Sequence, residues 1–370
     1  MKKIYFGFRL ALLSLIAAVF IAGCSFSQVK TDEEDGSSLV LMTWNVHNLF
    51  DGKDNGYEYD EFKEVSGWST EKYLGRINSI SSAIESIEPQ PDIIVFQEIE
   101  SIKILEDLAN SLSRGYSWSH FANNSQAALG LGILSRLPLL DTKVHSITIG
   151  NDTTPRPVLE TRIFTDEGSF IIFGCHWKSK LGGDDITENV RKASARVILR
   201  RIRELWEAEP ELGIIITGDL NECHDEFYRR DSKIICALLP DDPYCALLTG
   251  CIDEDNITNM QKDFFVLSKN KPPEPVHFPQ GTVVLFSPWM AELQDGTYYY
   301  RYNWETIDHF LVSNHFFTHS GLRYDRSIIV KGQHFTNTGG IPVPFNVRTG
   351  NGLSDHLPLL LVLKKPDGVL

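Results

Sequence analysis

Apolar residues follow two different periods along the chain. In residues 70–87 they recur every three or four positions, which predicts a helix whose apolar side is formed by Tyr73, Leu74, Ile77, Ile80, Ile84 and Ile87. Two more helices are expected at residues 101–113, with Ser101 as a candidate N-cap, and at 187–207. Elsewhere apolar residues form the short runs that are typical of buried strands. These runs span residues 39–45, 92–96, 117–122, 129–135, 144–149, 158–164, 170–176, 213–217, 281–286, 297–302, 306–312, 327–330 and 357–363.

Several of the predicted strands follow one another without an intervening helix. This order favours an α/β fold in which one sheet packs on another, with helices outside. The sequence has no internal repeat and no second linker, so we expect a single domain over residues 39–366. Within it, residues 222–275 show no regular period and are predicted to form a long irregular excursion.

The first 38 residues have a different character. Lys2, Lys3 and Arg9 accompany an uncharged apolar run at 10–22, which is short for a membrane span and typical of an export signal. The run ends in Ile21-Ala22-Gly23-Cys24, which resembles a bacterial lipobox. We therefore predict a lipoprotein signal peptide at 1–23, lipidation of Cys24 and a polar tether at 24–38. The alternative is an N-terminal anchor helix followed by an unrelated cysteine.

A lipid on Cys24 would place the exported protein in the bacterial cell envelope, on the outer membrane or facing the periplasm. Disulfides can form there. Cys175 lies in an apolar run and is expected to be a buried thiol. A cluster of four cysteines predicts two disulfides, whose pairing the sequence leaves open, and it lacks the paired spacing of a zinc site. These cysteines are Cys223, Cys236, Cys245 and Cys251.

The charge of the chain is acidic. Its 370 residues include 35 Lys and Arg against 49 Asp and Glu, a formal net charge of −14. Loss of the three positive charges of the signal peptide would take this value to −17. Such a balance argues against a basic nucleic-acid-binding protein, because phosphate affinity needs Lys and Arg on the contact face. It does not argue against an enzyme that reaches phosphate through a bound metal ion.

Small sets of polar residues stand where the predicted strands end. Each set alone is typical of a turn, a helix cap or a hydrogen-bonded core histidine. Together they supply carboxylate and amide oxygens, which are ligands for hard cations, and histidines, which carry protons. The sets are Thr43-Trp44-Asn45, Gln97-Glu98, His176, Asp219-Leu220-Asn221, Asp308-His309 and Ser354-Asp355-His356.

The order of these sets, together with residues 132–138 and the Lys178-Ser179 that follows His176, resembles the endonuclease/exonuclease/phosphatase (DNase I-like) superfamily. The matching pieces run from Trp44 to His356. Residues 44–51 and 176–180 look most like bacterial secreted and extracellular nucleases. The resemblance implies a four-layer α/β sandwich, in which two mostly antiparallel sheets are flanked by helices.

The resemblance also implies residue roles. Glu98 would be the main ligand of Mg²⁺ or Mn²⁺, helped by Asn45 and Asp355, with Ca²⁺ as an additional ion. A catalytic group would act on the phosphate and the attacking water. Its members are His176 at the scissile phosphate, Asp219 and Asn221 at the water and phosphoryl oxygens, and His356 with Asp308 as its orienting carboxylate. Whether Asp219 or His356 is the general base, and whether one or two ions bind, stays open.

Other residues are candidates for binding the rest of the substrate. Arg156 and Arg162, on the strand before His176, are predicted to bind phosphate, because a guanidinium grips two oxygens. Lys178 is predicted to bind phosphate through its positive charge beside the site. The alternative for either arginine is a surface ion pair. The run 298–300 and Trp304 are candidates for stacking on bases, and packing within the protein is the alternative.

Three functions are consistent with these residues. The first is a metal-dependent phosphodiesterase that acts as a nuclease on DNA, with RNA left open, outside the cytoplasm. The second uses the same site on inositol phosphates or sphingomyelin-type lipids. The third is a non-catalytic surface lipoprotein. We expect nucleic acid as the substrate, a monomer without a stable protein partner, and contact with the membrane through the lipid anchor only.

Overall fold

The computed structural model describes residues 38–124, 127–230, 236–241, 264–273 and 282–366. The predicted signal peptide, the lipidation of Cys24 and all but the last residue of the predicted tether lie outside these residues. Within the described ranges, no helix is both long and apolar enough to cross a membrane.

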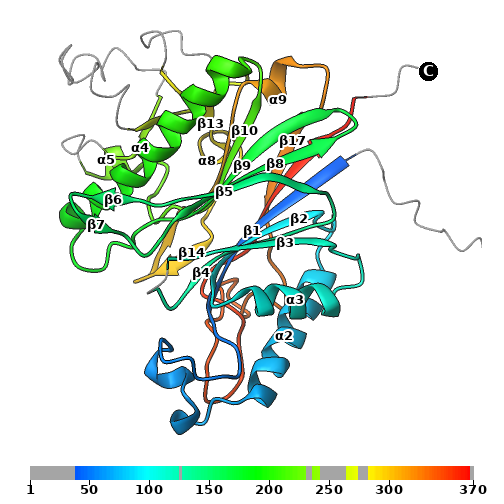
Figure 1. Ribbon diagram of the computed structural model, residues 1–370, viewed down its shortest axis with the longest axis vertical. Coiled ribbons are helices and arrows are strands. Elements are labelled where there is room, and N and C mark those ends of the chain that lie inside the picture. The colour runs from blue at the N-terminus through cyan, green and yellow to red at the C-terminus, as the bar shows by residue number, and fades with distance from the viewer. Residues whose placement is uncertain (1–37, 125–126, 231–235, 242–263, 274–281, 367–370) are drawn as a thin grey trace, which may run out of the picture. The chain divides into compact units, whose positions relative to one another are not determined.

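Two large sheets form the centre of the fold (Figure 1). The first has the strand order β17 (Arg323–Ile329), β18 (Leu359–Lys364), β1 (Ser38–Leu49), β2 (Ile93–Ile99), β4 (Gly130–Ser135) and β3 (Trp118–Ala122). The second has the order β11 (Leu238–Pro240), β12 (Phe265–Ser268), β13 (Val284–Phe286), β16 (Asp308–Val312), β10 (Gly213–Asp219), β9 (Gly168–His176), β8 (Val158–Thr165) and β5 (Leu139–His145). Most neighbouring strands are antiparallel, but four pairs run parallel: β1 with β2, β9 with β10, β11 with β12, and β12 with β13.

The remaining elements are helices and two small hairpins. The longer helices are α2 (Thr70–Glu85), α3 (Ile102–Ser111) and α4 (Asp184–Ala208). The short helices are η1 (Asp60–Phe62), η2 (Glu64–Ser66), α5 (Glu226–Arg229), α8 (Pro288–Ala291) and α9 (His315–Thr318). The hairpins pair β6 (Thr148–Ile149) with β7 (Asp152–Thr153), and β14 (Tyr298–Tyr300) with β15 (Asn303–Glu305).

Strand periodicity explains the layers. In β1, Leu39 and Leu41 pack into the core between the two sheets, whereas Val40 and Met42 face the core under α2 and α3. In β9, Phe173 faces the other way, into a core that includes residues of α4. The helices therefore cover the outer faces of the two sheets, and the predicted four-layer α/β sandwich is confirmed (Figure 1).

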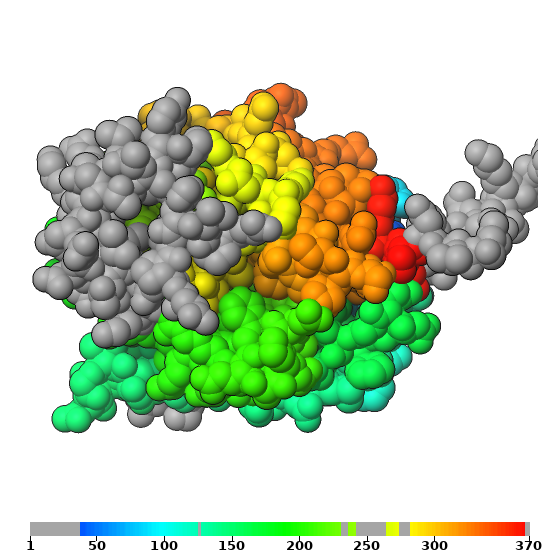
Figure 2. Space-filling view, turned by 90° about the horizontal axis from the view of Figure 1, so that it is seen from above, coloured from blue at the N-terminus to red at the C-terminus, as the bar shows by residue number. Residues whose placement is uncertain are grey.

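Some element predictions need correction. Leu74 lies at the edge of the apolar side of α2 and is 47% exposed. The predicted strand at 144–149 is wrong, because β5 ends at His145 and Ile147 then turns into the core against α4. The excursion at 222–275 is partly regular, since β11 and β12 extend the second sheet. The segments that follow α4 and α9 meet, since His319 Nε2 is 2.7 Å from Glu211 Oε2, and the green and orange surfaces of these regions adjoin in Figure 2.

The cysteine prediction is also corrected. Cys175 is a buried free thiol, as expected, but Cys223 and Cys236 are free as well. Cys223 Sγ lies 2.7 Å from Glu305 Oε2, and Cys236 Sγ lies 2.8 Å from the carbonyl oxygen of Leu238. The two thiols therefore face different oxygens, and the four cysteines do not form two disulfides. The other two cysteines of the cluster lie outside the described residues.

The junction of the second sheet with α4 contains a buried carboxylate, Glu160 on β8. Arg201 donates to it from α4 at 2.8 and 3.0 Å, and His145 Nε2 lies 2.6 Å away. Burial alone would raise the pKa of Glu160, but the hydrogen bonds and charges of His145 and Arg201 lower it to about 2. A pKa below that of the unfolded chain means that Glu160 stabilises the fold above about pH 4.5. This stabilisation is lost as the pH falls towards 2.

We expect Glu160→Gln to reduce the free energy of unfolding at pH 7 by about 2–3 kcal/mol. Urea denaturation at pH 7 and pH 3 measures the effect, which should be smaller at pH 3 because the wild-type carboxylate is then losing its advantage. Glu209→Gln is the matched control, since Glu209 pairs with Arg162 at the surface and should change stability little. An equal loss at both pH values would contradict the assigned pKa.

Candidate active site

The strand register brings the predicted catalytic residues together. Asp219, the last residue of β10, is paired with His176 on the parallel strand β9 and with Asp308 on the antiparallel strand β16. In the first sheet, Asn45 of β1 is paired with Gln97, the residue before Glu98 on β2. Polar side chains from both sheets therefore meet at one end of the sandwich.

Asp219 stands at the centre of this group. Its Oδ2 atom accepts a hydrogen bond from Asn45 Nδ2 at 3.1 Å, a contact that joins the two sheets. The same oxygen lies 3.7 Å from His176 Nε2 and 4.0 Å from His356 Nε2. Its Oδ1 atom accepts from the backbone N–H of Asn221 at 2.8 Å. One buried carboxylate thus has all the other groups of the predicted catalytic set around it, with Asp308 as its partner in the sheet.

Asp308 acts on His356. His356 Nδ1 lies 2.8 Å from Asp308 Oδ2, and Thr297 Oγ1 donates to that same oxygen at 2.6 Å. The ring of Tyr298 stacks on the imidazole with centroids 4.6 Å apart, and Trp44 Nε1 donates to the carbonyl oxygen of His356. These contacts fix the imidazole with Nε2 on the side of Asp219.

The three central groups differ in their pKa values. Burial, with the charge of Asp308, raises the pKa of Asp219 to about 7. Burial alone would lower the pKa of His356, but the charge and hydrogen bond of Asp308, with Asp355 and Asp219, raise it to about 10. Burial and the charges of Arg156, His356 and Lys178 hold the pKa of His176 well below its usual value. At neutral pH, His356 is therefore an imidazolium and His176 is neutral.

The predicted metal ligands lie beside this group. Glu98 has a φ of 63° at an irregularity in β2, and its carboxylate accepts from Asn45 Nδ2 at 3.3 Å and from the backbone of Asn48 at 2.9 Å. The charges of Glu98 and Asp355 both act on Arg76, so both carboxylates lie near this residue. Oxygen donors of this kind fit Mg²⁺ or Mn²⁺.

Two details qualify the ligand set. The Asn45 amide turns its nitrogen to the carboxylates, and its oxygen accepts from the backbone of His47 at 3.0 Å. A ligand role for Asn45 therefore requires its amide to turn over. Ligand atoms of Asp219, Asp308 and His356 also lie within 4.8 Å of one another, but the hydrogen bond between Asp308 and His356 already uses two of them. The carboxylate of Glu98 is the more open ligand, with its side chain 18% exposed.

Sequence reasoning missed Arg76, a buried residue on α2. Its guanidinium donates to the carbonyl oxygens of Val46, His47 and Asn48 at 2.5–2.6 Å, and its Cζ lies 3.9 Å from the ring centroid of Phe345. Burial lowers its pKa to about 9, against the charges of Glu98 and Asp355. Arg76 thereby holds the segment after β1, where His47 and Asn48 have positive φ. The sequence signal that could have identified Arg76 is its position next to Ile77, near the apolar side of the predicted helix.

The residues predicted to bind phosphate separate into two groups. Arg156 donates to the carbonyl oxygen of Trp177, and its charge, like that of Lys178, acts on His176. Their phosphate-binding role stays a prediction. Arg162 does not join the site, because it is paired with Ile171, five positions before His176 in β9. It forms a bidentate ion pair with Glu209 at 2.7 and 3.0 Å, so the surface ion pair is the right interpretation.

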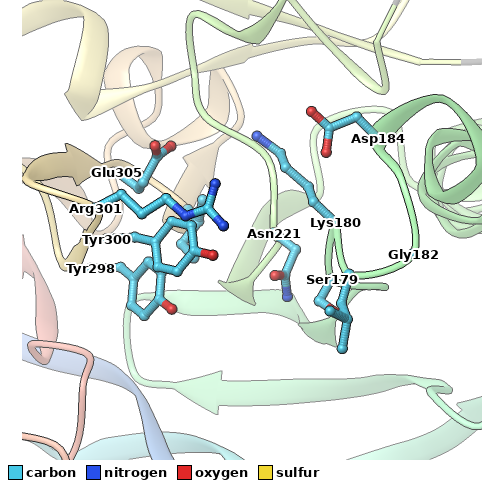
Figure 3. Close-up of a pocket in the computed structure, with 11 residues that line it drawn as sticks. Ser179, Lys180, Gly182, Asp184, Asn221, Tyr298, Tyr300, Arg301 and Glu305 are labelled. Carbon is cyan, nitrogen blue, oxygen red and sulfur yellow. The ribbon is translucent and has the colours of Figure 1, made fainter.

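A cavity of about 620 Å³ adjoins the catalytic group at Asn221 (Figure 3). Tyr298, Tyr300 and Arg301 line one side of it, and Ser179 and Lys180 line the other. Tyr299 points elsewhere and packs edge-on against Trp304 with centroids 5.1 Å apart. The tyrosine run is thus divided between the cavity and packing within the protein.

Two packed sheets whose adjoining ends carry an aspartate–histidine pair and further carboxylates define the DNase I-like class of phosphodiesterase folds. Residues 40–235 match the model of the Endonuclease/Exonuclease/phosphatase family, and the chain belongs to this family. The predicted resemblance to this family is thereby confirmed. No curated protein matches the chain by sequence.

Two solved structures with low sequence identity and a TM-score of 0.50 share the fold. D. rerio TDP2 complexed with single strand DNA product is 14% identical, with a TM-score of 0.50 over 89% of this chain and 100% of that chain. TDP2 from Caenorhabditis elegans is 13% identical, with a TM-score of 0.50 over 90% and 76%. A family protein from Leptotrichia buccalis is 15% identical, with a TM-score of 0.48 over 88% and 99%.

Proposed function

We propose that the protein is a divalent-metal-dependent phosphodiesterase that acts as a nuclease on DNA. The observation that carries this proposal is the environment of Asp219, a buried carboxylate within 4.0 Å of two imidazoles and hydrogen-bonded to Asn45. Family membership supports hydrolysis of phosphate esters. A structural relative, TDP2 from D. rerio, is bound to a single strand DNA product, which is consistent with nucleic acid as the substrate.

Glu98, Asp355 and Asn45 would hold the ion. When bound, a divalent cation neutralises charge on phosphoryl oxygens and lowers the pKa of water. The carboxylate of Glu98 is oriented for this by the backbone of Asn48, and Arg76 fixes that backbone from behind.

The protein's own residues divide the proton chemistry. His356 has carboxylates near both ring nitrogens, so it stays protonated and acts as a charge next to the phosphate and as a proton donor. Asp219 is the general base, because it is the remaining group whose pKa lies near neutrality and whose oxygens are held in place by Asn221 and Asn45. His176, neutral and 3.7 Å from both Glu98 and Asp219, is placed to contact the phosphate as a hydrogen-bond donor.

Plasmid nicking by the mature chain with Mg²⁺, Mn²⁺, Ca²⁺ or EDTA tests this function. We expect nicking to require the ion and Glu98→Ala to lower the rate at least about a hundredfold, because it removes the main predicted ligand of the ion. Arg162→Ala is the matched control and should retain wild-type activity, since Arg162 pairs with Glu209 away from the site.

The outcomes separate the alternatives. Nicking that persists in EDTA would contradict metal dependence. Turnover of an inositol phosphate or sphingomyelin without any nicking would replace the nuclease by the second function. Wild-type rates for Glu98→Ala on every phosphodiester would reject the assigned site.

A further inference from the structure

The cavity next to the catalytic group has a wall built as a stacked column. The ring of Tyr298 lies on His356 with centroids 4.6 Å apart, and the ring of Tyr300 lies nearly parallel to Tyr298 at 6.1 Å. The guanidinium carbon of Arg301 is 5.1 Å from the centroid of Tyr300. Figure 3 shows both tyrosine hydroxyls and the guanidinium on the side that faces Asn221 and Lys180. The column therefore runs along one wall of the cavity from the catalytic imidazole to the guanidinium of Arg301.

The charges around the cavity single out Arg301. Two charged residues of the lining are paired with groups outside it: Lys180 Nζ lies 2.6 Å from Glu226 Oε2, and Glu305 Oε2 lies 3.1 Å from Arg229 Nη1. Asp184 lines the cavity from the start of α4. Within the described residues, Arg301 has no carboxylate partner. Its planar fork is free to bind an oxyanion.

The turn that carries Arg301 is conformationally unfavourable. Arg301 and Tyr302 form a two-residue turn between β14 and β15, with φ values of 47° and 69°. Two positive φ values are typical of a type I′ turn, which favours Asn-Gly over residues with large side chains. Strain of this kind at the edge of a site indicates a functional use for the side chains. The turn holds Arg301 over the Tyr300 ring.

We propose that this cavity is a subsite for a second phosphate of the substrate, next to the scissile phosphodiester, and that Arg301 and the hydroxyls of Tyr298 and Tyr300 bind it. The inference rests on the proposed function, because Asn221 places the scissile phosphate at one end of the cavity. A chain of net charge −14 attracts no polyanion as a whole, so a local cation is needed. The neighbouring phosphate of a nucleic-acid strand supplies this chemistry, and so does an inositol polyphosphate.

The test compares Arg301→Ala with the wild-type chain on three substrates. These are a short single-stranded DNA oligonucleotide, an inositol polyphosphate, and bis(4-nitrophenyl) phosphate, which has one phosphate only. We expect kcat/KM for the oligonucleotide to fall about tenfold, mainly through KM, with no change for bis(4-nitrophenyl) phosphate. The slope of log kcat/KM against log salt should also become shallower by about 0.7, as for the loss of one phosphate contact.

A second variant excludes a general folding defect. Arg301→Asn with Tyr302→Gly suits the type I′ turn, so it should raise the thermal midpoint while reproducing the loss on the oligonucleotide. A tenfold loss on the inositol polyphosphate alone supports the subsite and assigns its phosphate to that source. Equal changes on all substrates, or none, would overturn the subsite.

Failure of the proposed function gives a different result. In that case neither the wild-type chain nor the variants hydrolyse any of the three substrates. The subsite is then judged from the fluorescence anisotropy of a labelled oligonucleotide in Ca²⁺. Binding that Arg301→Ala weakens about tenfold supports it, and unchanged binding refutes it.

Discussion

Replacing Asp219 by asparagine is expected to lower kcat on DNA by at least about a thousandfold without loss of the fold. The amide is nearly isosteric, and its oxygen can still accept from Asn45, which keeps the link between the sheets while the bond from the Asn221 backbone is lost. It cannot take a proton from water. The rate of a single turnover on an oligonucleotide, with the urea midpoint measured in parallel, checks both parts of this expectation.

The pH dependence follows from the pKa of Asp219. The base works when deprotonated, so the wild-type rate should rise with pH, reach half its maximum near pH 7 and level off at higher pH. A bound cation nearby moves this rise to lower pH. Asp219→Asn should show no such rise. Asp184→Asn, at the far side of the cavity, is the control and should keep the wild-type profile. A rise that persists in Asp219→Asn would assign the base elsewhere, with His356 the first alternative.

Asp308→Asn is expected to reduce kcat by about a thousandfold or more, because it removes the acceptor that orients His356 and keeps it charged. Without that carboxylate, burial dominates and the pKa of His356 falls from about 10. The imidazole then loses its charge near neutral pH. A titration of the His356 ring followed by ¹⁵N NMR measures this directly.

Thr297→Val is the matched control for Asp308. It removes only the neutral hydrogen bond to Asp308 Oδ2 and should lower kcat about tenfold or less. If Asp308→Asn keeps a rate within tenfold of wild type while the pKa of His356 stays high, the orienting role of Asp308 is wrong.

The sequence predicts this centre well because its residues stand at strand ends. A polar residue directly after a buried run is displayed at the edge of a sheet, and parallel strands such as β9 and β10 bring their ends to the same edge. Asn45, Glu98 and Asp219 could be placed in this way. The layered arrangement of sheets and helices could be predicted from the same kind of pattern, since alternate residues of β1 face different cores.

Arg162 shows what the sequence does not determine. Arg162 belongs to the predicted strand at 158–164, which precedes the strand of His176, but its distance from His176 depends on the register of β8 against β9. That register places it opposite Ile171, at the wrong end. The prediction of two disulfides fails for a similar reason, because spacing along the chain does not determine the directions of the thiols of Cys223 and Cys236.

Arg76 and the Tyr298 column depend on packing between distant segments. The helical period marks residue 76 only as a position near the apolar side, and nothing in it predicts three backbone carbonyls as partners. The run 298–300 alternates, so two tyrosines face the cavity and Tyr299 packs on Trp304. The side that each faces follows from where the hairpin docks.

The position of β18 between β1 and β17 makes the site depend on residues far along the chain. Ser354 Oγ donates to the carbonyl oxygen of Asn45 at 2.6 Å, across a separation of 309 positions. Trp44 reaches His356 across 312 positions. A chain without residues 354–364 leaves the β18 side of β1 unpaired and has no His356 imidazole. We therefore expect activity only after β18 has paired with β1, and contacts so distant in sequence are expected to slow that pairing.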